Sequence, residues 1–385
     1  MLASPLGRLG VWYFFYFAFV GAFAPFFTLY LQDVGLSAWE IGVLMSVPQV
    51  MRLVAPNLWG WLADHLGHGG HRVRIVRLAA LFSALGFAGF FFTRDYVPML
   101  LAMALVWFFW SAALPLVEAM TLDYLAEHPD RYGRIRLWGS IGFIVSVLVI
   151  GALLDYLPIA ALLWAILAIL ASVLASALTL PDAKVGVGGT APPLSGLLKR
   201  PEVLALLAAC FFMAVAHGPL YVFYSIHLVD HGYGKMAVGL FWSLGVLAEI
   251  GVFMAMPRLM RRVPLRRILL ASFALAILRF LLIGWGADSP LLLVIAQLLH
   301  GATFGAYHAA AMAVLTRWFV SRQQARIQGI YGSISFGAGG MVGGIVSGAV
   351  WGSLGAGITY TLAALCAVCG WWLVWRSPAA AWPVR

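Results

Sequence analysis

The chain has 385 residues, of which 63% are hydrophobic and only 10% are charged, and its mean hydropathy is +0.96. Soluble globular domains carry about 25% charged residues. This composition therefore excludes a soluble globular protein and predicts a polytopic membrane protein. The net charge of +10 does not indicate a nucleic-acid partner, because membrane proteins concentrate basic residues in their cytoplasmic loops.

Twelve apolar stretches are long enough to cross a bilayer, since about 20 helical residues span its hydrocarbon core. The predicted spans are 11–31, 39–62, 73–93, 97–124, 136–156, 158–180, 202–229, 236–257, 267–286, 289–316, 327–350 and 355–375. The first lacks a signal-peptide cleavage site and is expected to be retained. Of 24 Lys and Arg residues, 20 fall on one side, Arg94 and Lys235 on the other, and two inside spans. This bias predicts a multi-pass protein of the cell membrane, of the bacterial inner-membrane kind, with both termini in the cytoplasm.

A Gly/Pro-rich segment divides the spans into six and six. We expect an N-terminal six-helix bundle over 1–181, a cytoplasmic linker over 182–200 and a C-terminal six-helix bundle over 201–385. The motif that begins at Arg134 recurs from Arg326, which places Gly139 and Gly332 193 positions apart. The predicted fold is therefore all-α and membrane-integral, with two pseudo-symmetric bundles.

Four charged side chains lie well inside predicted spans: Glu118, Glu249, Arg52 and Arg279. Each costs on the order of 2.5 to 3.5 kcal/mol at the bilayer centre, so we expect them to be compensated, with one acid and one base in each half. Such pairs either lock the bundles structurally or act in function, and the midplane position of Glu249 favours function.

Aromatic and polar side chains share helix faces with these charges. The predicted substrate-binding residues are Arg52, Gln49, Glu118, His217, Tyr221, Tyr224, Trp242, Phe304 and Tyr307. Aromatic rings can stack on an aromatic cargo while a guanidinium binds its carboxylate, although aromatic stripes also serve plain helix packing. The pattern favours a small organic anion as the substrate.

Proton coupling is expected from the same groups. Movement of Arg279 relative to Glu249 would switch that carboxyl between holding and releasing a proton, and histidine can share the relay. The predicted proton-coupling residues are Glu249, Arg279, His300 and His308. Apolar helices also hold histidines as hydrogen-bonded packing residues, so which group carries the proton stays open.

Several motifs resemble one transporter family. They are the Phe14–Phe17 and Gly21–Phe27 segments of the first span, Gly60–Gly67 after the second, Tyr132–Ile141, the Glu249 stretch, and Gln297–Met312. The chain is identified as a member of the major facilitator superfamily, and it resembles the 3-phenylpropionic acid transporter branch, which is related to lactose permease. The resemblance implies alternating access and a conformational latch at Gly60, Asp64, Gly67 and Arg72. The basic residues that the family carries after the latch acid are replaced here by His65, His68 and Gly69, so Arg72 or Arg74 is expected to pair with Asp64.

Other functions remain alternatives to symport of an aromatic carboxylic acid. They are proton-coupled symport of a neutral sugar or nucleoside, drug/proton antiport, and a receptor or scaffold that does not transport. An enzyme is not expected, because the sequence lacks H-E-x-x-H and G-x-S-x-G motifs. We expect no metal and no cofactor, and the proton gradient is the expected energy source. The expected partners are a small-molecule substrate, protons and membrane lipid. The protein is expected to be a monomer.

Overall fold

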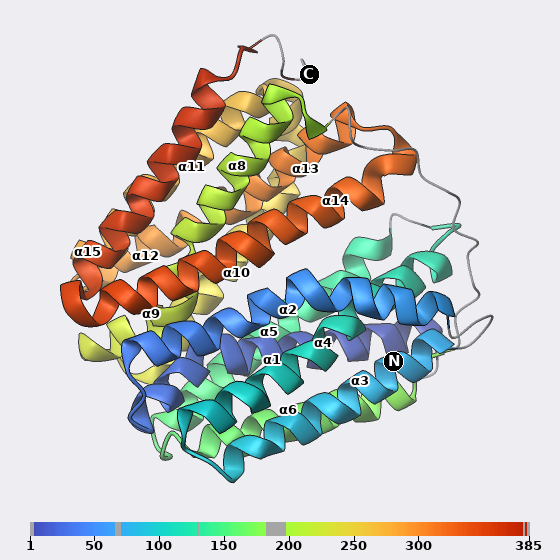
Figure 1. The fold of residues 1–385 in the computed structure, drawn as a ribbon, viewed down its shortest axis with the longest axis vertical. Coiled ribbons are helices and arrows are strands. Elements are labelled where there is room, and N and C mark those ends of the chain that lie inside the picture. The colour runs from blue at the N-terminus through green and yellow to red at the C-terminus, as the bar shows by residue number, and fades with distance from the viewer. Residues whose placement is uncertain (1–3, 66–70, 129–130, 182–197, 380–381, 383–385) are drawn as a thin grey trace. The chain divides into compact units, whose positions relative to one another are not determined.

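The computed structural model describes residues 4–65, 71–128, 131–181, 198–379 and 382. In this part of the chain all regular secondary structure is helical. The chain divides into two compact units (Figure 1). Unit 1 comprises Met1–Val187 with Tyr233–Leu240, and unit 2 comprises Gly188–Gly232 with Phe241–Arg385. Most of the predicted linker, 182–197, lies outside the described residues, so the predicted bundle boundaries stay predictions.

Unit 1 contains the first six predicted spans. Its helices are α1 (Pro5–Asp33), α2 (Ala38–His65), α3 (His71–Ala88) with the short η1 (Gly89–Phe91), α4 (Tyr96–Tyr124), α5 (Tyr132–Leu154) and α6 (Ala161–Leu178). The Ser4 hydroxyl caps α1 by accepting from the Gly7 amide at 3.1 Å, and Pro5 occupies the first turn, where its missing N–H costs nothing.

Glycines shape the extensive contact between α1 and α5 in unit 1. A Cβ added at Gly21 would lie 2.6 Å from the Phe143 carbonyl oxygen, and one at Gly142 would overlap the Phe14 carbonyl. Only glycine allows two helix backbones to approach this closely. The glycines of α5 and α1 thus hold α5 against the aromatic face of α1.

Unit 2 contains the other spans, several of them interrupted. Its helical segments are α8 (Pro201–Ala216), α9 (Gly218–Asp230), α10 (Lys235–Arg262, whose first residues belong to unit 1), α11 (Leu265–Trp285), α12 (Pro290–Leu298), η3 (Gly301–Ala306), α13 (Tyr307–Trp318), η4 (Ser321–Gln323), α14 (Gln324–Gly332), η5 (Ser333–Gly339) and α15 (Gly340–Arg376). The seventh span changes from α8 to α9 at His217, where Gly218 and Pro219 follow, as a proline inside a helix predicts.

Two of these interruptions are π-helical turns, η3 and η5. A π-turn widens the helix locally and is found most often at functional sites. In unit 2, η3 divides the tenth predicted span beside Arg279 and Glu249, and η5 divides the eleventh. Neither turn contains a proline, which would mark an interruption in the sequence.

Each predicted span falls on a described helix or on consecutive helical segments. Ten described stretches are apolar and long enough to cross a membrane, and the last of them, Arg326–Arg376, is broken at Gly355, whose φ is +76°. Figure 1 shows two helices meeting there. The all-α membrane fold is confirmed, whereas the count of twelve also rests on α2 and on the division at Gly355.

Candidate functional site

Arg279 of α11 is fully buried in unit 2 and is bound by neutral acceptors. Its Nε donates to the Ala296 carbonyl at 2.9 Å, and its Nη1 donates to the Thr303 hydroxyl at 3.1 Å. Nη2 donates to Gln297 Oε1, and Nη1 also approaches His217 Nε2, both at 3.4 Å. Hydrogen bonds alone can thus hold a buried guanidinium, but its positive charge is left to act on neighbouring groups.

The hydrogen bonds of His217 identify its tautomer. Its Nδ1 lies 2.8 Å from the Met213 carbonyl, which can only accept, so Nδ1 carries the proton. Its Nε2 faces the Arg279 guanidinium, which can only donate, so Nε2 is an acceptor. His217 is therefore the neutral Nδ1–H form in this arrangement, and it serves as a partner of Arg279.

Glu249 of α10 lies beside His300, with Oε2 3.8 Å from Nε2. The two side chains are largely buried, with 21% and 10% of their surfaces exposed. Among the described residues, the buried His300 Nδ1 has no hydrogen-bond partner. The pair can share one proton, either as imidazolium beside carboxylate or as imidazole beside carboxylic acid.

Small residues bring these groups together. A Cβ at Gly245 would lie 3.1 Å from Gln297 Oε1 and 3.3 Å from the His300 ring, and one at Gly301 would lie 2.6 Å from the Ala248 carbonyl. A Cβ at Gly305 would lie 3.3 Å from Glu249 Cγ. The glycines on α10 and η3 therefore bring Glu249 to His300 by removing the atoms that would separate the helices.

Aromatic side chains extend from this polar cluster in two directions. Tyr221 stacks on Trp242 with ring centroids 6.2 Å apart, Tyr224 meets the same indole edge-on, and the Trp242 Nε1 donates to Ser225. Phe304 stacks between two histidines, 5.4 Å from His300 and 6.3 Å from His308.

Two side chains of the tenth span are bound to neighbouring helices. Tyr307 is buried, with its hydroxyl 3.5 Å from the Cys210 carbonyl of α8, while the Nδ1 of His308 lies 2.9 Å from the Tyr331 hydroxyl. Tyr307 thus occupies the core of unit 2, whereas Phe304 and His308 continue the line of rings that begins at His300.

A second charged cluster lies in unit 1. Arg136 of α5 pairs with Glu118 of α4, with Nε 3.7 Å from Oε1, and about a third of each side chain is exposed. The guanidinium lies 4.1 Å from the Phe17 ring centroid and 5.7 Å from that of Tyr13, both on α1. This is an accessible cation on an aromatic surface, a geometry that stabilises Arg and leaves donors for an anion.

Tyr16 links a third charge to this cluster. Its hydroxyl lies within electrostatic range of Arg52, Glu118 and Arg136, and its ring stacks on Trp110 at 4.2 Å. Arg52 itself is exposed on α2, and Gln49, one turn earlier, is partly buried. Two arginines and one glutamate give the cluster a formal charge of +1, which one monocarboxylate would neutralise.

The model of one family, the MFS_1 like family, matches residues 6–362. The chain belongs to this family of major facilitator transporters. Its curated relatives include a probable 3-phenylpropionic acid transporter of Escherichia coli K12, 29% identical over 94% of this chain and 96% of the relative. The maltose permease of Geobacillus stearothermophilus is 28% identical over 94% and 91%. These relatives and the family are transporters, not enzymes.

Solved structures agree on the fold. The crystal structure of the nucleoside transporter NupG matches 97% of this chain and 100% of its own, with a TM-score of 0.82 and 18% identity. At this identity the match establishes the major facilitator fold alone.

The latch residues of this major facilitator chain are described only in part. Gly60 and Asp64 lie in α2, and Gly67 lies outside the described residues. Arg72 forms an ion pair with Asp123 of α4, in which Nη1 lies 3.0 Å from Oδ2. Arg72 is thus engaged within unit 1, and its role in a latch stays a prediction.

Arg136, Gln297 and Thr303 were not among the predicted site residues. Arg136 is the first residue of the predicted span 136–156 and was counted with the basic residues of the cytoplasmic side, whereas α5 begins one turn earlier, at Tyr132. Gln297 and Thr303, which accept from Arg279, lie in the Gln297–Met312 motif but carry no charge. A search for polar residues beside the intramembrane arginine would have found them.

Proposed function

We propose that this transporter takes up a small aromatic carboxylic acid together with protons by alternating access. It would act in the bacterial inner membrane with both termini in the cytoplasm, as a monomer and without a cofactor, driven by the proton gradient. The observation that carries the proposal is the +1 cluster of Arg52, Arg136 and Glu118 around buried aromatic rings in unit 1. The name of the Escherichia coli relative, a probable 3-phenylpropionic acid transporter, supports the same cargo class.

Cargo recognition would depend on the weakness of the Glu118–Arg136 ion pair. At 3.7 Å and one third exposed, this contact is weak, so a cargo carboxylate can form shorter, bidentate hydrogen bonds with the guanidinium. The cargo's aromatic ring would lie against Phe17 and Tyr13, which already contact Arg136. Arg52 would supply the second positive charge.

Proton coupling would use the Glu249–His300 pair in unit 2. Release of the proton that Glu249 and His300 share would leave a carboxylate beside a neutral imidazole, which lies within electrostatic range of the positive charge of Arg279. His217 would act as the fixed acceptor for Arg279. A small movement of the π-turn η3, which carries no fixed α-helical hydrogen-bond register, would change the distance between Glu249 and His300.

The test uses proteoliposomes with a trapped pH dye. Adding 3-phenylpropionate outside should acidify the lumen faster than in protein-free liposomes, which report leak of the protonated acid. Glu249→Gln should still bind the acid, measured by quenching of tryptophan fluorescence, but should show only the leak rate. Proton uptake by Glu249→Gln at the wild-type rate would remove Glu249 from the mechanism.

A neutral cargo is the second candidate, because the maltose permease and a putative nucleoside transporter are also relatives of this chain. The same vesicles distinguish the two. Proton uptake with maltose or uridine but not with 3-phenylpropionate would retain proton coupling and overturn the anion assignment.

A further inference from the structure

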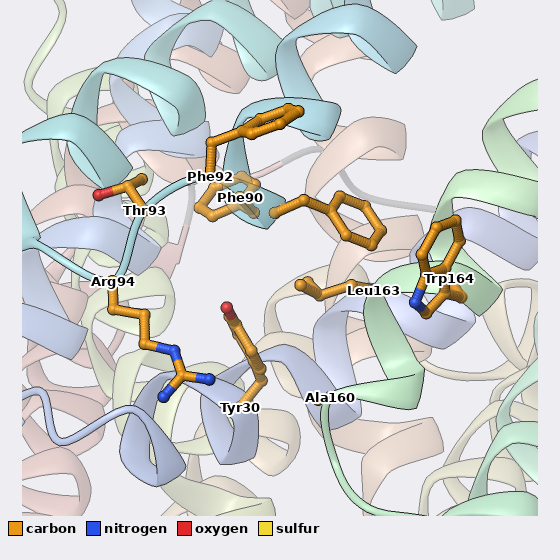
Figure 2. A pocket seen from close by; sticks show the side chains of 9 residues that line it. Tyr30, Phe90, Phe92, Thr93, Arg94, Ala160, Leu163 and Trp164 are labelled. Atoms are coloured by element: carbon orange, nitrogen blue, oxygen red, sulfur yellow. The ribbon is translucent and has the colours of Figure 1, made fainter.

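A cavity of about 300 Å³ lies at one end of unit 1, and neither charged cluster contributes to its lining (Figure 2). It is formed where α1 and η1 end, where α6 begins and where the chain enters α4. Its lining residues are Tyr30, Phe90, Phe91, Phe92, Thr93, Arg94, Ala160, Leu163 and Trp164. This end of the bundle is the one that the charge distribution predicts to face outward, where Arg94 and Lys235 are the only basic residues.

The polar part of the cavity consists of Tyr30, Thr93 and Arg94. Tyr30 is 4% exposed, and it lines the cavity together with Arg94. Figure 2 shows the Tyr30 hydroxyl pointing into the open centre, with the Arg94 guanidinium beside it. Polar groups that line a small cavity need hydrogen-bond partners, so a ligand or water is expected there. Together Tyr30 and Arg94 offer donors to one oxyanion.

The rim of the cavity is apolar and open. Phe92 is 88% exposed and Trp164 is 67% exposed, while Phe91 meets the Trp164 ring edge-on at 4.6 Å. Inside the rim, Leu163 and Phe90 are buried and face the same space. Aromatic side chains at helix ends are typical of the membrane–water interface, where lipid headgroups lie. The surroundings therefore suit an amphipathic molecule that arrives from the bilayer.

We propose that this cavity binds the phosphodiester headgroup of a membrane phospholipid. The Tyr30 hydroxyl and the Arg94 guanidinium donate to the phosphate oxygens, and Phe90, Leu163 and the Trp164 ring contact the glycerol and the first acyl carbons. Asp33 also lies within electrostatic range of Tyr30, which favours a monoanionic diester over a dianionic free phosphate. The proposal does not depend on which cargo the protein transports.

Native mass spectrometry of protein released from phosphatidylglycerol nanodiscs tests the site. The wild type should retain one lipid after the others dissociate. Arg94→Gln and Tyr30→Phe should each reduce that retained fraction about tenfold, the factor expected for a hydrogen bond to a charged group. The control is Lys235→Gln, which removes the other basic residue predicted on this side without touching the cavity, and it should retain the lipid.

Equal lipid retention by the wild type, Arg94→Gln and Tyr30→Phe would overturn the proposal. So would displacement of the lipid by inorganic phosphate, which would assign the cavity to a free anion, or by 3-phenylpropionate, which would assign it to cargo. Thermal unfolding of Tyr30→Phe at the wild-type temperature shows that a lost lipid is a binding effect. Transport of 3-phenylpropionate in the same samples reports separately on the proposed function.

Discussion

The intramembrane arginines of the two units differ in burial and in their partners. In unit 1, Arg136 is one third exposed, rests on the Phe17 ring and has a loose carboxylate partner. In unit 2, Arg279 is fully buried, and a backbone carbonyl, a threonine, a glutamine and a histidine accept its hydrogen bonds. An accessible cation can exchange its partner for a ligand, whereas a fully bound one positions its neighbours. Similar charges in the two units therefore support different roles.

The largest effect should come from Arg279→Gln. The substitution leaves the Ala296 carbonyl and the Thr303 hydroxyl without their donor inside unit 2, so we expect destabilisation of about 1–3 kcal/mol for each of the two groups. The measurement is the apparent Tm in detergent. Arg279→Lys, which keeps the charge but not the planar fork, should fall between this variant and the wild type. An unchanged Tm for Arg279→Gln, with transport lost, would make Arg279 a transport residue instead of a positioning one.

Arg136→Gln should do the opposite, weakening cargo binding while preserving the fold. We expect the KM for 3-phenylpropionate to rise about 10- to 150-fold, because charge-assisted hydrogen bonds contribute about 1.5–3 kcal/mol. The apparent Tm should change little, because an ion pair this exposed contributes about 0–1 kcal/mol. Arg134→Gln, an exposed neighbour on α5, is the matched control. Equal KM values for the two variants would exclude Arg136 from the cargo site.

Gly139 and Gly332 occupy equivalent positions in the repeated motif, and substituting them should have smaller effects on stability. A Cβ at Gly139 would lie 2.6 Å from the Phe17 ring and 2.9 Å from Arg136 Nη1, whereas at Gly332 nothing lies within 4 Å. Gly139→Ala should destabilise unit 1 by about 1–3 kcal/mol through overpacking. Gly332→Ala should instead add about 0.5–1 kcal/mol, the helix-propensity difference. Equal Tm shifts in detergent would show that the repeats pack alike.

Apolar patterning predicted the helices and the positions of Glu118, Glu249, Arg52 and Arg279 within them. Length and hydropathy determine these features locally, so no tertiary information was needed. Gly218 and Pro219 likewise account for the change of helix at His217, because proline interrupts a helix. The family resemblance, carried by motifs along the chain, agrees with the matched family and the structural neighbours.

The residues that bind each intramembrane charge were harder to predict. Counting charges suggested an acid and a base for each half, but Arg279 is bound by Gln297, Thr303 and a backbone carbonyl, which a charge count overlooks. Arg136 was missed because its helix already begins at Tyr132. The π-turns η3 and η5 were also not expected, because a π-turn depends on packing between helices and has no composition signature as clear as that of proline.

The smallest effect, and the sharpest separation within unit 2, should come from its two central histidines. His217→Gln retains an amide oxygen that can accept from Arg279, so proton uptake driven by 3-phenylpropionate should persist, with a loss of about 1 kcal/mol or less in stability. His300→Gln removes the titratable partner of Glu249 and should slow that uptake while leaving cargo exchange without a proton gradient intact. Both rates come from one proteoliposome preparation, with exchange as the control for folding.

The reverse pattern would mean that the Nδ1–H tautomer of His217 is not fixed by Met213 and Arg279, and that the proton passes through His217. Because the two rings lie only 6.4 Å apart, the hydrogen bonds of each histidine, rather than its depth in the unit, decide which one can titrate.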